Sequence, residues 1–393
     1  RNACRRCGNH HKKWAIIRAS SSRKYIHGTI LPTATGKSRC PILGYEKGSY
    51  SNLHPNEHVN MSQSTNDVYP TALKIAAFNN VLGLLEAMDI LRLSFERKAE
   101  EFSDVIKMGR TQLQDAVPMT LGQEFLSYAI MLGEDQDRLR EAAFLLHEIN
   151  MGGTAIGTGI NSHPDYARLV CLNLSEITGL PLKTAPNLIE ATQDCGVFVH
   201  LSGVLKRIAV KISKVCNDLR LLSSGPRTGF NEITLPAVQA GSSIMPGKIN
   251  PVIPEVVNQV AFEVIGNDLT ITFAAEGGQL QLNAFEPIIA YSLFKSIDHL
   301  RAAFLTLESR CISGITANRE HLRSNVENSI GLATALNSYI GYQAATALAV
   351  EALSSGKGIA ELVLEHRLLP AQKLAEILMP EALTKPQRVG PDT

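Results

Sequence analysis

The sequence predicts an all-α protein, a bundle of long helices with a small C-terminal helical domain. Apolar residues recur at helical spacing over several long stretches, and strand signals are almost absent. Hydrophobic residues make up 45% of the 393 residues and aromatic residues only 6%, which favours the aliphatic core of a helix bundle. We expect more than one domain: an incomplete, atypical N-terminal segment (1–66), the long-helix bundle (67–315) and the small helical domain (316–393).

Apolar stripes and boundary residues place the helices in order along the chain. They predict helices over about 70–102, 120–147, 164–178, 188–222, 252–268, 285–311 and 336–354. The stripe of the first helix is Leu73, Ala77, Val81, Leu84, Met88, Leu91 and Phe95. The stripe of the helix over 188–222 is Val197, Leu201, Leu205, Ile208, Ile212, Val215 and Leu219. The second helix has its own start signal, because Thr120 and Gln123 have the spacing of a capping box.

Charge and cysteine content exclude several classes of protein. Residues 1–45 hold ten Lys and Arg and no acidic residue, so the rest of the chain has 28 basic and 37 acidic residues, a balance of −9. A mildly acidic body argues against nucleic acid as the partner. No apolar run reaches the roughly 18 residues of a membrane span. Seven scattered cysteines are typical of reduced thiols, so we expect a cytoplasmic protein.

Two alternatives concern the N-terminal residues. Cys4, Cys7, His10, His11 and Cys40 could be drawn as a zinc site, but their spacing fits no common zinc module, and we expect no metal. The Arg- and Ser-rich, acid-free composition of this segment is also that of a mitochondrial transit peptide, although it lacks an amphipathic stripe.

The most informative segment is residues 241–255, Gly-Ser-Ser-Ile-Met-Pro-Gly-Lys-Ile-Asn-Pro-Val-Ile-Pro-Glu. Two glycines bound a loop rich in polar side chains, and Pro251 and Pro254 precede or open the next helix. The loop should therefore end at a helix N-terminus, where free N–H groups and the helix dipole attract an anion. A mobile serine at such a place suits proton abstraction from a carboxylate substrate. Gly241 and Gly247 are expected to act as hinges.

Two other polar segments also come shortly before predicted helices. They are Asn60–Asp67, which contains Ser64, Thr65 and Asn66, and Gly109–Asp115. Ordinary helix capping accounts for one such residue in each segment, but these clusters exceed that need. Three anion-friendly helix starts suit a small dicarboxylate. Because the helix over 70–102 is roughly 50 Å long, Ser64–Asn66 and Thr111 cannot contact one small ligand within a subunit. We therefore predict a site assembled from several copies around a multi-subunit helical core.

All three segments resemble conserved regions of the fumarase/aspartase superfamily, and the serine loop matches its GSSxMPxKxNP motif nearly letter for letter. The resemblance extends from Gly44 to about Pro386. Within the superfamily it is stronger to aspartate ammonia-lyases than to fumarases. Fumarases usually have a histidine where Gln112 stands. Two further stretches are also similar to aspartases: residues 188–195, and residues 279–287, in which Glu286 lies.

This resemblance implies an activity and roles for individual residues. It implies reversible deamination of L-aspartate to fumarate and ammonia through an aci-carboxylate, in a homotetramer whose sites draw on three subunits. The implied base is Ser242, whose pKa Lys248 is expected to lower. Lys248 and Asn250 are the other implied catalytic residues, which position and polarise the substrate. The implied substrate-binding residues are Ser64, Thr65, Asn66, Thr111, Gln112, Ser243 and Met245. No metal or organic cofactor is implied.

Two other functions stay open at this point. One is a fumarate hydratase or related superfamily lyase, and the other is a catalytically inactive structural homologue. The second is kept open by the N-terminal region, where a Gly-Thr-Ser segment is expected around residues 20–35 and is absent. A shifted reading frame upstream of Gly44 would account for the foreign composition of residues 1–43.

Overall fold

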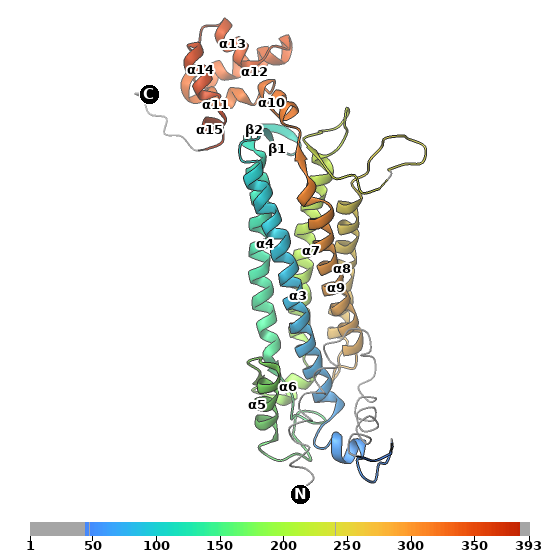
Figure 1. The fold of residues 1–393 in the computed structure, drawn as a ribbon. Helices are drawn as coiled ribbons and strands as arrows, with labels where there is room; N and C mark the ends of the chain where they lie inside the picture. The colour runs from blue at the N-terminus through green and yellow to red at the C-terminus, as the bar shows by residue number, and fades with distance from the viewer. Residues whose placement is uncertain (1–43, 47, 240, 386–393) are drawn as a thin grey trace. The chain divides into compact units, whose positions relative to one another are not determined.

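The computed structural model describes residues 44–46, 48–239 and 241–385, so the zinc alternative and the N-terminal expectations lie outside the described residues. Within these ranges long helices dominate (Figure 1). The five long helices are α3 (Thr65–Glu101), α4 (Leu121–Phe144), α7 (Gly196–Leu222), α8 (Val252–Glu276) and α9 (Glu286–Arg310). The predicted all-α, long-helix architecture is confirmed. None of the described helices is long and apolar enough to cross a membrane.

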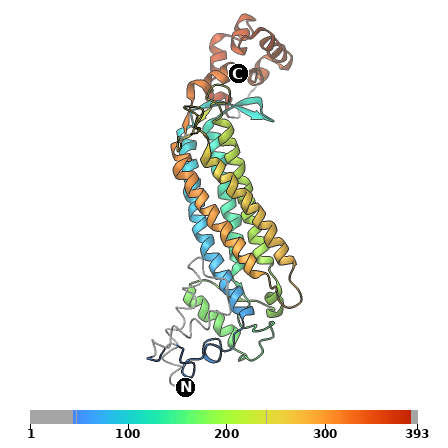
Figure 2. The ribbon, with the colours of Figure 1, turned by 90° about the vertical axis from the view of Figure 1, so that its right-hand side faces the viewer.

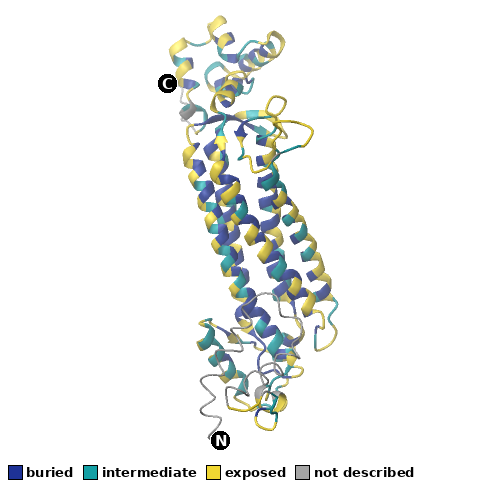
Figure 3. Cartoon of the chain, turned by 45° about the vertical axis from the view of Figure 1, so that its right-hand side comes forward, coloured by how far each residue is buried: buried dark blue, intermediate teal, exposed yellow. Residues whose placement is uncertain are grey.

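The chain forms two compact units, and each contains part of every long helix. The described part of the first unit comprises residues 44–87, 135–210 and 260–302, and that of the second comprises 88–134, 211–259 and 303–385. Within each unit the helix segments lie side by side (Figures 1 and 2). Their inward faces are buried and their outward faces exposed (Figure 3). Burial of these apolar stripes drives helix packing.

The first unit adds short elements at the ends of its helices. They are the π-helix η2 (Pro55–Val59), the 3-10 helix η3 (Leu145–His147), β3 (Glu148–Ile149), α5 (Tyr166–Thr178), β4 (Lys183–Thr184) and α6 (Leu188–Gln193). β3 and β4 pair in parallel. A small core of Ile75, Ile149, Met151, Cys171 and Leu182 packs here. Loops of this unit thus converge on the N-terminal end of α3.

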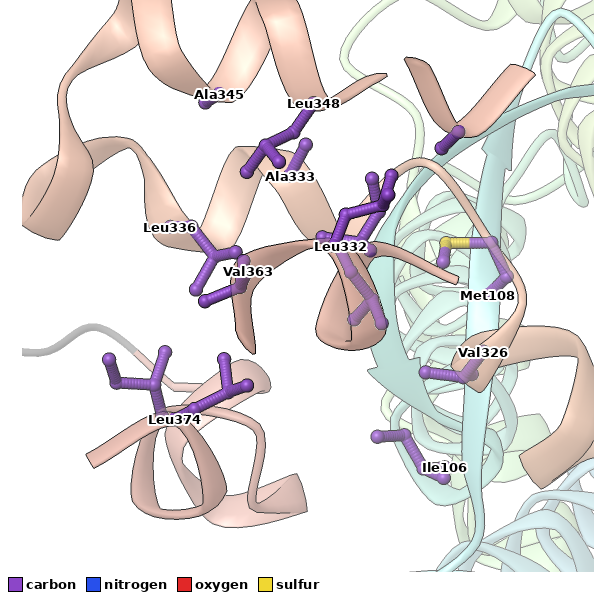
Figure 4. Packing of buried hydrophobic residues seen from close by; sticks show 14 residues of the cluster. Ile106, Met108, Val326, Leu332, Ala333, Leu336, Ala345, Leu348, Val363 and Leu374 are labelled. Atoms are coloured by element: carbon purple, nitrogen blue, oxygen red, sulfur yellow. The ribbon is translucent and has the colours of Figure 1, made fainter. Parts of the chain in front are cut away.

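The second unit contains a β-hairpin and the C-terminal helices. β1 (Ile106–Thr111) pairs antiparallel with β2 (Gln114–Thr120), and β5 (Ile233–Thr234) pairs with β6 (Thr316–Ala317). The C-terminal elements are the 3-10 helix η4 (Ile312–Gly314), α10 (Arg319–Glu327), α11 (Leu332–Ile340), α12 (Tyr342–Ser355), α13 (Ile359–Glu365), α14 (Ala371–Ile377) and α15 (Pro380–Leu383). Ile106 and Met108 of β1 join the apolar core of these helices (Figure 4).

Several predicted details are confirmed. The stripe from Leu73 to Phe95 is buried throughout. The capping box also forms, because Gln123 N–H donates to Thr120 Oγ1 at 3.0 Å while Thr120 N–H donates to Gln123 Oε1 at 3.0 Å. Val197 was wrongly included in the α7 stripe: it is only half-buried, and Phe198 is buried in its place.

Two predicted helices are each broken in two, and strands occur where none were predicted. The helix expected over 188–222 breaks into α6 and α7, and that expected over 336–354 breaks at Gly341, whose φ of +84° ends α11. Strands were not expected, yet β1 and β2 occupy residues 106–120. Their connecting residues Gln112 and Leu113 have φ of +54° and +63°. Both central residues of a two-residue I′ hairpin turn need positive φ, and Asn-Gly is the usual signal for it. Gln-Leu gives no such signal.

Candidate active site

The serine loop is built around the side chain of Ser242. Its Oγ accepts hydrogen bonds from the backbone N–H groups of Ile244 and Met245, at 3.2 and 3.1 Å. Ser242 is partly exposed, whereas Ser243, Met245 and Lys248 are exposed. Two N–H groups that converge on one hydroxyl oxygen stabilise negative charge on that oxygen.

The ends of the loop are held together by backbone contacts. Asn250 Nδ2 donates to the carbonyl oxygen of Gly241 at 2.8 Å. A Cβ at position 241 would lie 2.0 Å from the carbonyl oxygen of Lys248, so only glycine fits this approach. Gly247 has φ of +79° and open space around its Cα. The loop is therefore closed at its base and exposed at its tip.

The helix expected after this loop is present. α8 begins at Val252, directly after Pro251, and Glu255 N–H donates to Pro251 O at 3.2 Å. The first-turn N–H groups of an α-helix lack intrahelical partners and attract an anion. The predicted start of the helix is confirmed.

The Ser64–Asn66 segment lies at the N-terminus of α3, which starts five residues earlier than predicted. Ser64 precedes the helix, and its Oγ accepts the N–H of Asn66 at 3.2 Å, so Ser64 does cap α3. Asn66 Nδ2 donates to Ala155 O at 2.7 Å. Thr65 is exposed, and its side chain is the most accessible of the three.

Thr111 and Gln112 lie at the tip of the β1–β2 hairpin rather than before a helix. Thr111 ends β1, and Gln112 is the first turn residue. Both are exposed. The interpretation of Gly109–Asp115 as an anion-binding helix start is therefore wrong, because all of β2 separates Thr111 from α4. The hairpin can still present both side chains to a ligand.

A buried ion network, which the sequence-based argument missed, anchors this hairpin within the second unit. The carboxylate of Glu232 is buried between Lys107 Nζ, at 2.8 Å, and the Arg110 guanidinium. Lys107 Nζ also lies 2.6 Å from Glu124 Oε2, and the Arg110 guanidinium lies 4.2 Å from the ring centroid of Phe230. Arg110 thus holds the strand in place and is not a free anion-attracting side chain.

Glu286, singled out above by resemblance, is buried at the start of α9 in the first unit. Burial raises its pKa to about 7, and the positive charge of Lys74 opposes that rise. Lys74 is itself buried, donates to Glu148 O at 2.8 Å, and has its pKa lowered by burial. Two buried ionisable groups with shifted pKa values form a polar centre close to α3.

The predicted residues fall into three groups along the chain. Ser242, Ser243, Met245, Lys248 and Asn250 share one loop, Ser64–Asn66 precede or open α3, and Thr111 and Gln112 follow its other end. α3 has 37 residues, so at 1.5 Å per residue it is roughly 55 Å long. Ser64–Asn66 belong to the first unit and Thr111 to the second. Among the described residues, no group of three or more His, Cys, Asp or Glu side chains could hold a metal ion.

Comparisons with known proteins agree with this architecture. A family model described as a lyase matches residues 36–266, and one described as the fumarase C C-terminus matches residues 332–385. An aspartate ammonia-lyase of Pseudomonas aeruginosa is 61% identical over 348 residues, which cover 88% of this chain and 73% of that protein. The aspartate ammonia-lyase of Helicobacter pylori is 59% identical over 344 residues, covering 88% and 74%.

A solved structure of a lyase also matches this chain in fold and in sequence. The fumarate lyase:delta crystallin from Brucella melitensis, bound to cobalt, has a TM-score of 0.89 and 53% identity, with 91% of this chain and 78% of that chain covered. Matched helices and matched sequence over most of the length define a helical lyase. The chain belongs to the fumarase/aspartase superfamily and, within it, is a carbon–nitrogen lyase of the aspartate ammonia-lyase kind.

Proposed function

We propose that the chain catalyses the reversible deamination of L-aspartate to fumarate and ammonia. The observation that carries the proposal is the 241–250 loop, in which Ser242 Oγ accepts two backbone N–H groups directly before the N-terminus of α8. The named relatives support aspartate as the substrate.

Ser242 acts as the base in this proposal. Its oxygen removes a proton from C3 of aspartate, and the electron pair moves into the adjacent carboxylate to give an aci-carboxylate. Serine is a poor base in water, but the N–H groups of Ile244 and Met245 favour its anionic form. Closure of the loop around the substrate would exclude water and strengthen both bonds.

The developing charge on the substrate needs fixed donors. Free N–H groups at the start of α8, the amine of Lys248 and the hydroxyl of Ser243 supply them. Asn250 holds the base of the loop through its bond to Gly241 O. The electron pair returns from the aci-carboxylate to form the C2–C3 double bond, and the amine leaves C2 as ammonia. Thr65, Asn66, Thr111 and Gln112 hold the rest of the substrate.

We propose that the site is assembled from several subunits of a homotetramer. The length of α3 supports this, because the helix that separates Ser64–Asn66 from Thr111 along the chain has 37 residues, or roughly 55 Å. α8 also exposes an apolar stripe, Phe262, Ile265, Leu269 and Phe273, at a spacing typical of helix–helix seams. We also propose that the domains divide after residues 66 and 315 and that the protein is cytoplasmic.

The direct test is the absorbance of fumarate formed by the purified full chain from L-aspartate, compared with that formed from L-malate. We expect fumarate and one equivalent of ammonia from aspartate and no appreciable reaction with malate. Turnover of malate alone would favour a fumarate hydratase. Turnover of neither substrate by the intact assembly would favour a structural homologue.

A further inference from the structure

The segment Ser64–Asn66 is held by the next residue, Asp67, whose side chain is fully buried. Asp67 Oδ1 accepts the N–H of Ser64 at 2.9 Å. Together with the bond from Asn66 N–H to Ser64 Oγ, this gives a reciprocal cap similar to a capping box, in which the N2 rather than the N3 N–H donates to the serine. A cap alone requires only one carboxylate oxygen.

The second oxygen of Asp67 does something else. Asp67 Oδ2 accepts the N–H groups of Gly152 and Thr154, at 3.1 and 2.9 Å, so it ties a loop 85 residues away to the start of α3. Burial raises the pKa of Asp67, and these backbone bonds oppose the rise. A buried carboxylate held by several N–H groups is costly to disturb, because each lost acceptor leaves a donor unpaired.

The loop that Asp67 holds is strained. Thr154 has φ of +57°, a conformation that a β-branched residue rarely adopts, and its buried hydroxyl has no hydrogen-bond partner among the residues that the structure describes. Such strain persists only where surrounding contacts impose it, and it gathers at functional sites. The bond from Thr154 N–H to Asp67 is one of those contacts.

Further bonds join the same loop to the binding segment. Asn150 Nδ2 donates to Asn66 O at 2.9 Å, and Asn66 Nδ2 donates to Ala155 O at 2.7 Å. Residues 150–155 and 64–67 therefore form one hydrogen-bonded body inside the first unit. Thr65, in its middle, stays exposed.

We propose that Asp67 is a positioning residue of the substrate site, which fixes Thr65 and Asn66 by clamping the strained loop 152–154 against the start of α3. The proposal rests on the proposed function, since Thr65 and Asn66 bind the substrate there. Asp67 touches neither substrate nor reacting atoms and acts only through its neighbours.

The test is Asp67→Asn in the full chain. The amide that replaces the Asp67 carboxylate in this variant has one acceptor oxygen and one NH₂ donor in place of two acceptor oxygens. Its NH₂ group would therefore face either the N–H of Ser64 or the N–H groups of Gly152 and Thr154, and those donors would lose their acceptor. We expect the KM for aspartate to rise about tenfold or more while kcat stays within about threefold, because a binding segment moves and the base does not. The matched control is Asp268→Asn. Asp268 is a buried carboxylate of the same unit, which accepts from Ser202 Oγ and Lys206 Nζ away from this segment.

A similar fall in thermal midpoint for both variants, with KM raised only in Asp67→Asn, supports the proposal. An unchanged KM in Asp67→Asn, or an equal rise in Asp268→Asn, overturns it. If Asp67→Asn does not fold, Asp67→Glu keeps the charge and the cap but displaces the second oxygen, and an unchanged KM there also overturns it. Calorimetric titration of the same proteins with fumarate gives a second readout. If the wild-type chain binds fumarate but does not turn over aspartate, only the proposed function is overturned. If it neither binds fumarate nor turns over aspartate, both proposals are overturned.

Discussion

At the scale of single residues, the hydroxyl of Ser242 illustrates how backbone donors change side-chain chemistry. Its oxygen accepts N–H groups from the two residues that follow Ser243. These donors come from the turn itself and need no other element. The short sequence of the loop thus contains both the proposed base and the N–H groups that contact it.

Ser242→Ala removes the proposed base, while the bond from Asn250 Nδ2 to Gly241 O still closes the loop. We expect kcat for aspartate deamination to fall by about a hundred- to ten-thousandfold, because general-base catalysis typically contributes that much. Fumarate should still bind with nearly unchanged affinity, measured by calorimetry. Ser309→Ala, on an exposed face of α9, is the control and should keep wild-type turnover. Full activity of the Ser242 variant would exclude this serine as the base.

Glu286 predicts a pH dependence of stability. Its pKa is about 7 in the folded protein, against 4.5 in the unfolded chain. Between these values the folded state keeps a proton that the unfolded state has lost, so the free energy of unfolding falls as pH rises. In Glu286→Gln this fall should be absent, and the variant should exceed wild type by about 3 kcal/mol above pH 7. Urea midpoints measured from pH 4.5 to 8 check this, and parallel profiles for the two proteins would contradict it.

At the scale of elements, the β1–β2 hairpin carries strain at its tip. Gln112 and Leu113 both have positive φ, which is unfavourable for residues with a Cβ. The network of Lys107, Arg110 and Glu232 fixes the base of the hairpin. Thr111 and Gln112 thus lie at the exposed tip of a hairpin whose base is anchored by ion pairs.

Leu113→Gly should therefore stabilise the protein. Glycine adopts this φ without strain, and the side chain that it removes is 63% exposed, so we expect a gain of about 1 kcal/mol in the free energy of unfolding. Val117→Gly, in β2 of the same hairpin, should instead lose about 1 kcal/mol. Chemical denaturation measures both changes. A loss of stability in the Leu113 variant would show that its side chain contributes more than the strain costs.

At the scale of the whole molecule, the exposed stripe of α8 predicts how copies associate. Phe262 and Phe273 are 62% and 65% exposed, which is unusual for large aromatic residues unless they meet a partner. The double variant Phe262→Asp/Phe273→Asp should sediment as a smaller species and lose aspartate turnover by about a hundredfold or more, because the proposed composite site would no longer form. Tyr342→Asp, 75% exposed on α12, is the control. A monomeric variant with full activity would exclude a shared site.

Local patterns predicted much of this structure correctly. The stripe from Leu73 to Phe95 located α3, the capping box at Thr120 located the start of α4, and the prolines after Asn250 located the start of α8. In each case the signal consists of residues that follow one another at a spacing of about one helical turn. The broken helix at Gly341 was missed because apolar residues continue on both sides of it.

The sequence by itself determined the long helices, the serine loop and its place before α8, because helical periodicity, caps and proline constraints act between near neighbours. Only the tertiary structure decided that residues 106–120 form a hairpin, since Gln112 and Leu113 oppose the turn that they adopt. It also decided that Asp67 holds residues 152–154 and that Glu286 titrates near neutral pH. Both depend on burial and on hydrogen bonds between segments far apart in the chain, whose free energies no local pattern records.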